Sequence, residues 1–306
     1  MKTSLSLRDI LPSSKRCPKC HIIVFSCMPS DQTKVFNCST CSLQIKLFEG
    51  TLLQNSKLSL NQVDLLIKSF IKGKNVSNAY DLLYSHKEER LNAKTVEKYF
   101  DLFNRITLKY YLNKLETCLL EGIVEIDETH LYKQKKSSAP HRPYVLGDIW
   151  LFGMKDRITK SFLIVPLLSR EEKILIPLIR RFIRIGSTIY SDSFASYVNS
   201  KSCPKQSKLA QYNYPHEFVI HKIEFVSPYF PEVHTNSIES LWKDFKRFNR
   251  NINNKTKYLC SVSRFHFHHD LDSSNQLKYL MEGLFTPQLP EYQEFEEKIF
   301  NNLYFY

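Results

Sequence analysis

Three carboxylates that lie far apart in the sequence have the residue types needed to hold divalent metal ions. Asp127 and Asp192 each follow an apolar, β-branched run typical of a buried strand, and Glu239 opens a segment that we expect to be helical. Magnesium prefers hard oxygen ligands and keeps several of its waters, so a few carboxylates are enough to bind it. Two such ions, about 3.5–4 Å apart, activate an attacking hydroxyl and stabilise the leaving oxygen in phosphodiester transfer. We therefore predict a site with two Mg²⁺ (or Mn²⁺) ions, bridged by Asp127 and completed by Asp192 and Glu239.

Two of these acids also have a structural interpretation. Asp192 could cap a helix that begins near Ser193. Glu239 follows Asn236 by three residues, as in a capping box, and the Asn236 amide oxygen is itself a weaker alternative for the third metal ligand. Asp127 has no such alternative, because a carboxylate within an apolar strand is costly to bury without cations.

Four cysteines near the start of the chain form a second candidate metal centre. They occur as two Cys-x-x-Cys pairs separated by 17 residues, which is typical of a four-cysteine zinc site: Cys17, Cys20, Cys38 and Cys41. Short β-rich segments flank the pairs, so we expect residues 1–52 to form a zinc ribbon with one structural Zn²⁺. A module this small buries little apolar surface, and metal binding would supply its folding energy.

The overall charge favours a polyanionic partner. The 306 residues contain 43 lysines and arginines against 31 aspartates and glutamates, a net charge of +12. No apolar run approaches the roughly 20 residues needed to span a bilayer, and the first residues lack the apolar segment of a secretory signal. We therefore expect an intracellular, reducing environment, in which cysteines bind metal more often than they form disulfides.

The elements that must position these residues follow from the apolar periodicity. Residues 53–112 predict three short helices, either a DNA-binding helix-turn-helix or a helical linker. Residues 113–275 predict a mixed α/β domain, and residues 276–306 a C-terminal helical tail. The expected strands cover 122–132, 144–154, 161–168, 187–190 and 217–226, and the expected helices cover 171–185 and 238–248. Three strands, a helix, a strand that ends in an acid and a later helix that carries an acid follow the RNase H-like order.

The helix expected around Glu239 has two faces. Its apolar positions are Ile238, Leu241, Trp242, Phe245 and Phe248. Its polar positions include four candidate DNA-binding residues, Asn236, Lys243, Lys246 and Arg250, which would lie along a DNA backbone unless this is only a solvated cationic face.

Several neighbouring residues have a structural interpretation beside a functional one. His234 and His221 either orient water or phosphate or are structural histidines, and His266–His269 is interpreted as packing. Glu128 should point to the opposite face of its strand from Asp127.

Four segments carry a resemblance to a known family: 122–129 (Gly-Ile-Val-Glu-Ile-Asp-Glu-Thr), 190–197 (Tyr-Ser-Asp-Ser-Phe-Ala-Ser-Tyr), 221–226 (His-Lys-Ile-Glu-Phe-Val) and 234–242 (His-Thr-Asn-Ser-Ile-Glu-Ser-Leu-Trp). The chain resembles the Merlin-type DDE transposases and their bacterial insertion-sequence relatives. This resemblance implies a DNA transposase that cuts transposon ends and joins them to target DNA. It also implies double-stranded DNA as partner, a homodimer or higher oligomer on that DNA, and location in the nucleus of a eukaryote or, in a bacterium, in the cytoplasm or nucleoid; we favour the former.

Two other functions are compatible with the same residues. A domesticated, transposase-derived protein would keep the fold and bind DNA without cutting it. A nuclease with the same three acids would use water alone as the nucleophile, and would form no joined products.

Overall fold

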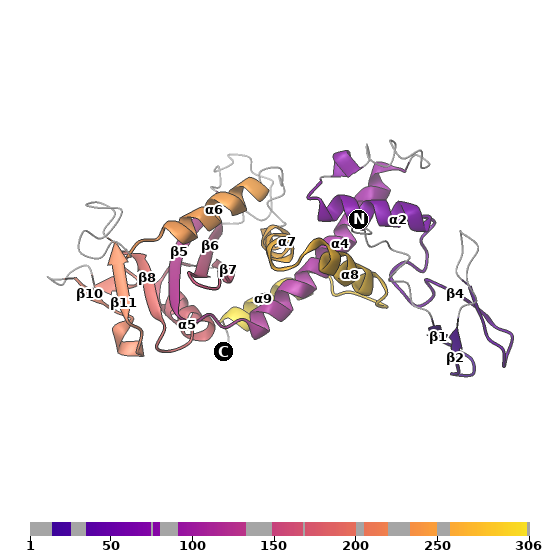
Figure 1. Ribbon diagram of the computed structural model, residues 1–306, viewed down its shortest axis with the longest axis horizontal. Helices are drawn as coiled ribbons and strands as arrows, with labels where there is room; N and C mark the ends of the chain where they lie inside the picture. The colour runs from indigo at the N-terminus through magenta and orange to yellow at the C-terminus, as the bar shows by residue number, and fades with distance from the viewer. Residues whose placement is uncertain are drawn as a thin grey trace, which may run out of the picture. The chain divides into compact units, whose positions relative to one another are not determined.

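The computed structural model describes residues 14–25, 35–74, 76–79, 91–132, 149–167, 169–199, 205–219, 233–249 and 258–304. The chain forms two compact units, the first comprising 1–111 and 266–295 and the second 112–265 and 296–306 (Figure 1). No helix within the described ranges is long and apolar enough to cross a membrane.

The first unit begins with two short hairpins. β1 (Ser14–Arg16) pairs antiparallel with β2 (Ile23–Phe25), and β3 (Val35–Asn37) pairs antiparallel with β4 (Gln44–Lys46). Their buried side chains form a small core with two of the cysteines: Cys17, Val24, Phe36, Cys38, Ile45 and Leu47. Paired hairpins with cysteines in the core are compatible with the predicted zinc ribbon.

Helices make up the rest of the first unit. α2 (Leu60–Ile71) begins with a capping box, in which Ser59 Oγ accepts the Gln62 N–H and Gln62 Oε1 accepts the Ser59 N–H. Its apolar face packs in one core with α4 (Ala93–Thr117) and α8 (Ser273–Leu284). The prediction of three short helices is wrong for the last of them, because α4 has 25 residues. Its apolar positions continue beyond Phe103 through Ile106, Leu108, Tyr111 and Leu115. The helices α7 (Tyr258–Asp270) and α9 (Tyr292–Tyr304), like α4, are divided between the two units.

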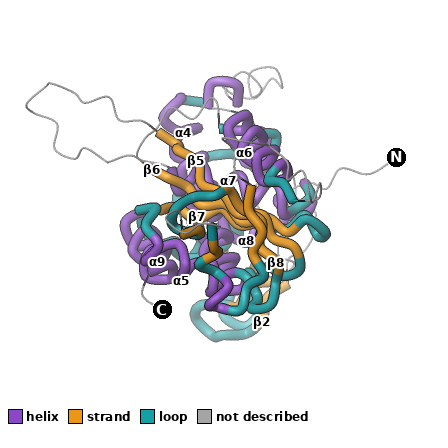
Figure 2. Tube along the Cα trace, turned by 90° about the vertical axis from the view of Figure 1, so that its left-hand side faces the viewer, coloured by secondary structure: helices purple, strands orange, loops and turns teal. Residues whose placement is uncertain are grey.

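The second unit contains a five-stranded mixed sheet, whose strands are seen together in Figure 2. The order is β11–β8–β5–β6–β7, with bounds β5 (Ile123–Tyr132), β6 (Ile149–Asp156), β7 (Phe162–Leu167), β8 (Thr188–Asp192) and β11 (His216–Val219). β8 runs parallel to β5 and β11, whereas β6 runs antiparallel to β5 and β7. This central mixed sheet with its helices fits the predicted RNase H-like transposase domain.

Two helices of this unit also occur where they were expected. α5 (Glu172–Phe182) connects β7 to β8, and α6 (Asn236–Phe248) follows β11 and packs on β5 and β6 (Figure 1). The last predicted strand begins one residue early, at His216, and its predicted continuation from 220 to 226 lies outside the described residues. A minor hairpin, β9 (Val198–Asn199) with β10 (Gln206–Ser207), and a 3-10 turn, Ala210–Tyr212, complete the unit.

Candidate active site and metal centre

Asp127 lies on β5, the central strand of the sheet, directly opposite Gly153 on β6. Burial raises the pKa of Asp127 to about 6, and the negative charges of Asp192 and, to a smaller extent, Glu239 add to this effect. A hydrogen bond from Trp242 partly offsets the rise. The three predicted acids therefore lie close enough for Asp127 to sense the other two, although one comes from each of three separate elements.

Asp192 ends β8, the strand that runs parallel to β5. The last paired residues of these two strands are Glu125 and Tyr190. Asp127 and Asp192 each lie two residues beyond that pair, which brings both acids to the same end of the sheet. The Asp192 Oδ1 atom accepts the Phe194 N–H at 3.0 Å in a turn rather than at a helix start, so the helix-capping interpretation of Asp192 is wrong.

Glu239 lies in the first turn of α6. This helix is N-capped by Thr235, whose side chain makes no capping hydrogen bond, and Asn236 is already the first helical residue. The predicted capping box between Asn236 and Glu239 is therefore wrong, since its cap is displaced by one residue. Neither the Asn236 nor the Glu239 side chain is used to cap the helix, which leaves both available as metal ligands.

Trp242 connects α6 to the first acid. Its indole Nε1–H donates to Asp127 Oδ2 at 2.9 Å. The ring lies directly over Gly153, where an added Cβ would be 2.5 Å from Trp242 Cζ2 and 3.0 Å from Ile238 Cδ1. Only glycine leaves room for this contact, so Gly153 allows Trp242 to reach Asp127. The apolar pattern placed Trp242 on the apolar face of its helix and did not indicate its contact with Asp127. The signal that could have indicated this contact was Gly153, because a glycine inside an apolar strand often marks the close approach of another group.

Glu128, the next residue along β5, has a different environment. Its Oε1 atom accepts a short hydrogen bond from the Tyr197 hydroxyl, whereas Asp127 is bound by Trp242. The partner of Asp127 thus comes from α6 and that of Glu128 from the turn before β9, as expected for side chains that alternate between the faces of a strand. Burial raises the pKa of Glu128 to about 8, the Tyr197 hydroxyl lowers it, and the charges of Asp127 and Asp192 raise it further.

The start of α6 is held by side chains that the sequence did not single out. Glu125, on β5, accepts the Ile238 N–H and the Arg157 Nε–H, and Arg157 also contacts His234. Glu125 is fully buried and lies two residues before Asp127, so it shares a face of the strand with that acid.

Three of the four predicted DNA-binding residues lie on the outer side of α6. Asn236, Lys243 and Lys246 are exposed, while the apolar positions Ile238, Leu241, Trp242 and Phe245 are buried and Phe248 is half-buried. The two-faced character predicted for this helix is confirmed. Arg250 and His221 lie outside the described residues. The His266–His269 cluster fits the packing interpretation, since His266 is buried and stacked on Tyr111.

The four cysteines of the first unit come together tightly. Their sulfur atoms all lie within 4.8 Å of one another, with Cys17 and Cys41 3.5 Å apart and Cys20 and Cys38 3.3 Å apart. No other group of three or more His, Cys, Asp or Glu side chains in the described ranges is as compact, so the three acids are spread more widely than the cysteines. Four converging thiols are the donor set of a structural zinc site, and they fit the metal.

The two cysteine turns have the same local geometry. In each Cys-x-x-Cys pair, the N–H of the residue that follows the second cysteine donates to the carbonyl oxygen of the first cysteine. His21 donates to Cys17 in this way, and Ser42 donates to Cys38. His21 and Ser42 both adopt positive φ, of 61° and 56°. Backbone N–H groups directed at its sulfur, led by that of Cys41, lower the pKa of Cys38 to about 6, and the same kind of hydrogen bond, led by that of Cys20, lowers the pKa of Cys17. Backbone N–H groups also lower the pKa of Cys20 and Cys41, but burial and hydrogen bonds with neighbouring thiols outweigh them and raise the pKa of both thiols overall, that of Cys20 to about 12. Without metal the turns therefore favour thiolates, the form that binds zinc, at Cys17 and Cys38.

The fit of the acids to magnesium rests on donor chemistry. Asp127, Asp192 and Glu239 offer carboxylate oxygens, which Mg²⁺ prefers, and a pair of ions bridged by shared ligands spans a wider group of donors than a single ion does. The charges of both other acids raise the pKa of Asp127, so it lies within electrostatic range of each, which suits a bridging ligand.

Comparison with known proteins gives one family match. Residues 119–261 match the model of the ISXO2-like transposase domain. One similar solved structure is a chain in the complex described as a simian T-cell lymphotropic virus intasome with PP2A regulatory subunit B56 gamma, at 18% identity and a TM-score of 0.31. The similarity covers 56% of this chain and 58% of that chain. No curated protein matches the chain. The family match includes all three predicted acids and supports placing this region in a DDE transposase family.

Proposed function

We propose that the chain is a DNA transposase of the Merlin type, which cuts transposon ends and joins them to target DNA by two-metal-ion phosphodiester transfer. Two observations support the proposal, within a region that matches a transposase family. Asp127 and Asp192 lie at the same end of two paired strands, and the first turns of α6, which carry Glu239, are joined to Asp127 by Trp242. The Merlin assignment rests on the resemblance of the motifs 190–197 and 234–242 to those of the Merlin-type transposases.

The residues of this chain would divide the chemistry as follows. Asp127, Asp192 and Glu239 would hold two Mg²⁺ ions, which activate the attacking hydroxyl and stabilise the leaving 3′ oxygen when bound. Trp242 holds the Oδ2 atom of Asp127 at 2.9 Å and so fixes the orientation of this carboxylate. The raised pKa of Asp127 means that metal and proton compete for this carboxylate below about pH 6.

Other parts of the chain would bind the substrate. Exposed Lys243 and Lys246 follow Glu239 along α6, so a DNA backbone that enters the acid cluster would meet cations on the same helix. The zinc ribbon and the helices that follow would supply recognition of the terminal repeats. Because two transposon ends must be paired, we propose that the protein acts as a homodimer or higher oligomer on DNA.

A gel assay on the ends of the element that encodes the chain tests this proposal. Wild-type protein with Mg²⁺ should give both cut ends and joined products. Each of three single variants should lower cleavage by about a thousandfold or more: Asp127→Ala, Asp192→Ala and Glu239→Ala. The three ligands act as a unit, so the loss of one disables the whole site. DNA binding should survive in all three, since each change removes negative charge near the DNA.

Glu217→Ala is the matched control, because Glu217 is an exposed acid on a neighbouring strand of the same sheet. Its cleavage should equal that of the wild type. Cutting without joining would instead indicate a nuclease that uses water only, and tight DNA binding without cutting would indicate a non-catalytic derivative.

A further inference from the structure

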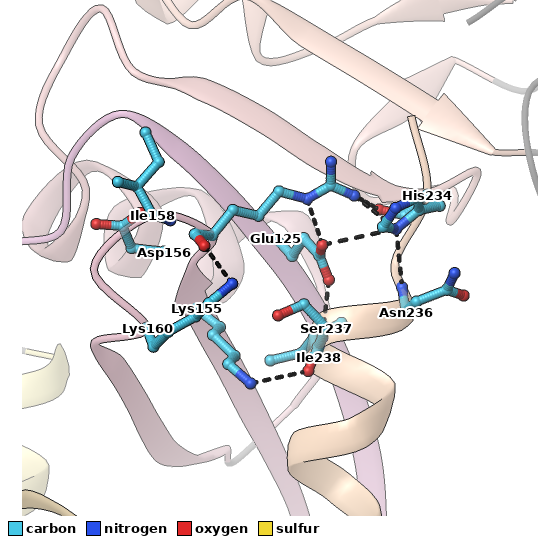
Figure 3. A network of polar contacts seen from close by, with 10 residues as sticks. Glu125, Lys155, Asp156, Ile158, Lys160, His234, Asn236, Ser237 and Ile238 are labelled. Carbon is cyan, nitrogen blue, oxygen red and sulfur yellow. Dashed lines mark hydrogen bonds and ion pairs between the residues drawn. The ribbon is translucent and has the colours of Figure 1, made fainter. Parts of the chain in front are cut away.

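A buried carboxylate joins the central strand to the start of α6. Glu125 is completely buried on β5, yet both of its oxygens are bound (Figure 3). Oε1 accepts the Arg157 Nε–H at 2.5 Å, and Oε2 accepts the backbone N–H of Ile238 at 2.7 Å. Ile238 immediately precedes Glu239, so this hydrogen bond fixes the backbone next to the third predicted metal ligand.

Arg157 extends the contact to the residues that lead into α6. One of its terminal nitrogens donates to His234 Nδ1 and to the His234 carbonyl oxygen, each at 2.6 Å. Guanidinium groups only donate hydrogen bonds, so His234 Nδ1 must be an acceptor and the ring proton must be on Nε2. The Asn236 N–H approaches the same Nδ1 at 3.3 Å, which agrees with this tautomer.

Lys155 adds a third attachment. Its Nζ atom donates to the Ser237 carbonyl oxygen at 3.1 Å (Figure 3). Side chains from β5, β6 and the turn after β6 therefore hold three positions at the start of α6, namely His234, Ser237 and Ile238. We call Glu125, Lys155 and Arg157 the α6 anchor.

We propose that Glu125 is a positioning residue, which through the α6 anchor holds the first turn of α6 where Glu239 can share metal ions with Asp127 and Asp192. This inference rests on the proposed function. Thr235 makes no side-chain cap, so the anchor supplies the polar partner that the helix start lacks. The negative charge of Glu125 also suits the N-terminus of a helix.

A carboxylate is needed at this position because both of its partners are donors. Glutamine has one acceptor oxygen and a donor NH₂ group, so one of the two contacts would become donor against donor. The change would also leave the Arg157 guanidinium without its buried counter-charge. Glu125→Gln keeps the size of the side chain but removes the charge and one of the two contacts that Glu125 contributes to the α6 anchor, which makes it the sharpest variant.

Asp156→Asn is the matched control. Asp156 is also a buried acid, one residue from Arg157, but its oxygens accept from Ile158 N–H and the Thr159 hydroxyl within the β6–β7 turn. Loss of a buried carboxylate from this turn should destabilise the same unit without loosening α6.

Two measurements on the full chain test the inference. Hydrogen exchange of the Glu239 amide should be about tenfold faster in Glu125→Gln than in wild type or Asp156→Asn, because this amide bonds to Thr235 within the anchored turn. The Mn²⁺ concentration for half-maximal change in Trp242 fluorescence, measured with Trp150→Phe in every variant, should rise about 10- to 100-fold only in Glu125→Gln.

Each outcome has one meaning. Unchanged exchange or unchanged Mn²⁺ affinity in Glu125→Gln, with wild-type binding intact, overturns the inference and leaves the proposed function standing. Failure of the wild-type chain to bind Mn²⁺ would instead contradict the proposed function. It would also contradict the positioning role of Glu125, which depends on that function. If Glu125→Gln does not fold, Arg157→Lys replaces it, because lysine keeps the charge beside Glu125 but lacks the fork that holds His234; the same two results are then required.

Discussion

The cysteine cluster and the acid cluster show two ways of assembling a candidate metal site. The four cysteines occupy residues 17–41, and two turns of the same geometry bring their sulfurs within 4.8 Å. The three acids occupy residues 127–239 and come from two strands and a helix. The first site is made by local backbone structure, whereas the second depends on the packing of a whole sheet and helix.

The difference explains where each site is vulnerable. Backbone hydrogen bonds inside the two cysteine turns place all four sulfurs, so the geometry of this site depends mainly on the hairpins themselves. The acid site depends on residues that are not ligands, among them Gly153, Trp242 and Glu125. Mutations outside the ligand set should therefore affect the acids more than the cysteines.

Removal of zinc should have the largest effect. Structural zinc contributes roughly 10–16 kcal/mol of apparent binding free energy in small modules at pH 7, so the hairpins should unfold without it. Metal analysis of the full chain should find one zinc, and a chelator should abolish amide protection in 14–25 and 35–47 while β5 to β8 stay protected. Cys38→Ser should behave like chelation, whereas Cys118→Ser, outside the cluster, should not. A chain without zinc, or protection that survives chelation, would refute the cysteine site.

Glu128 should make the stability of the second unit depend on pH. Its folded pKa of about 8 exceeds the ordinary value of 4.5, so the folded state binds more protons between these values. The contribution of Glu128 to the free energy of unfolding is fully present below about pH 4.5. It is lost as the pH rises to 8, by on the order of a few kcal/mol. Glu128→Gln should remove this loss. Both tryptophans, Trp150 and Trp242, lie in the second unit, so urea unfolding followed by their fluorescence at pH 6 and pH 9, without Mg²⁺, gives the comparison. An equally steep pH dependence in the variant would contradict the assignment.

Gly153→Ala should have a smaller effect on stability but a specific effect on the acid site. The new methyl group would overlap the Trp242 ring, at a cost of about 1–3 kcal/mol, and would displace the indole from Asp127. Gly283→Ala is a matched control, because its Cβ would lie 2.7 Å from Ile106 Cγ2 in the first unit. Both variants should lose stability, but only Gly153→Ala should weaken Mn²⁺ binding. Equal Mn²⁺ affinity in the two would show that the Trp242 contact does not support the site.

The sequence predicted the elements of this molecule better than the contacts between them. The apolar runs of the sequence located both ends of β5, β7 and β8 to within two residues, because these runs are bounded by polar residues. The cysteine spacing located the compact cluster for the same reason: both signals are local. The end of α4 was missed because its apolar face continues past residue 112, where we placed a domain boundary.

The supports of the acid cluster could not be predicted in the same way. Glu125 and Ile238 are 113 residues apart, and Arg157 occupies a turn with no motif of its own. Even the interpretation of Asn236 as a cap failed by one residue, since the helix is positioned by buried contacts rather than by its own first turn. These contacts depend on tertiary packing, which apolar periodicity does not encode.

The most direct test of the acid site is to measure which residue provides the third metal ligand. Isothermal titration of Mn²⁺ into the zinc-loaded full chain, bound to a short DNA duplex, should compare wild type with Glu239→Gln and Asn236→Ala. We expect Glu239→Gln to lose about tenfold or more in affinity, because it keeps the shape but removes the charge that neutralises the metal. Asn236→Ala should bind like wild type. Wild-type affinity in Glu239→Gln, together with loss in Asn236→Ala, would contradict the proposed acid site and move the third ligand to Asn236.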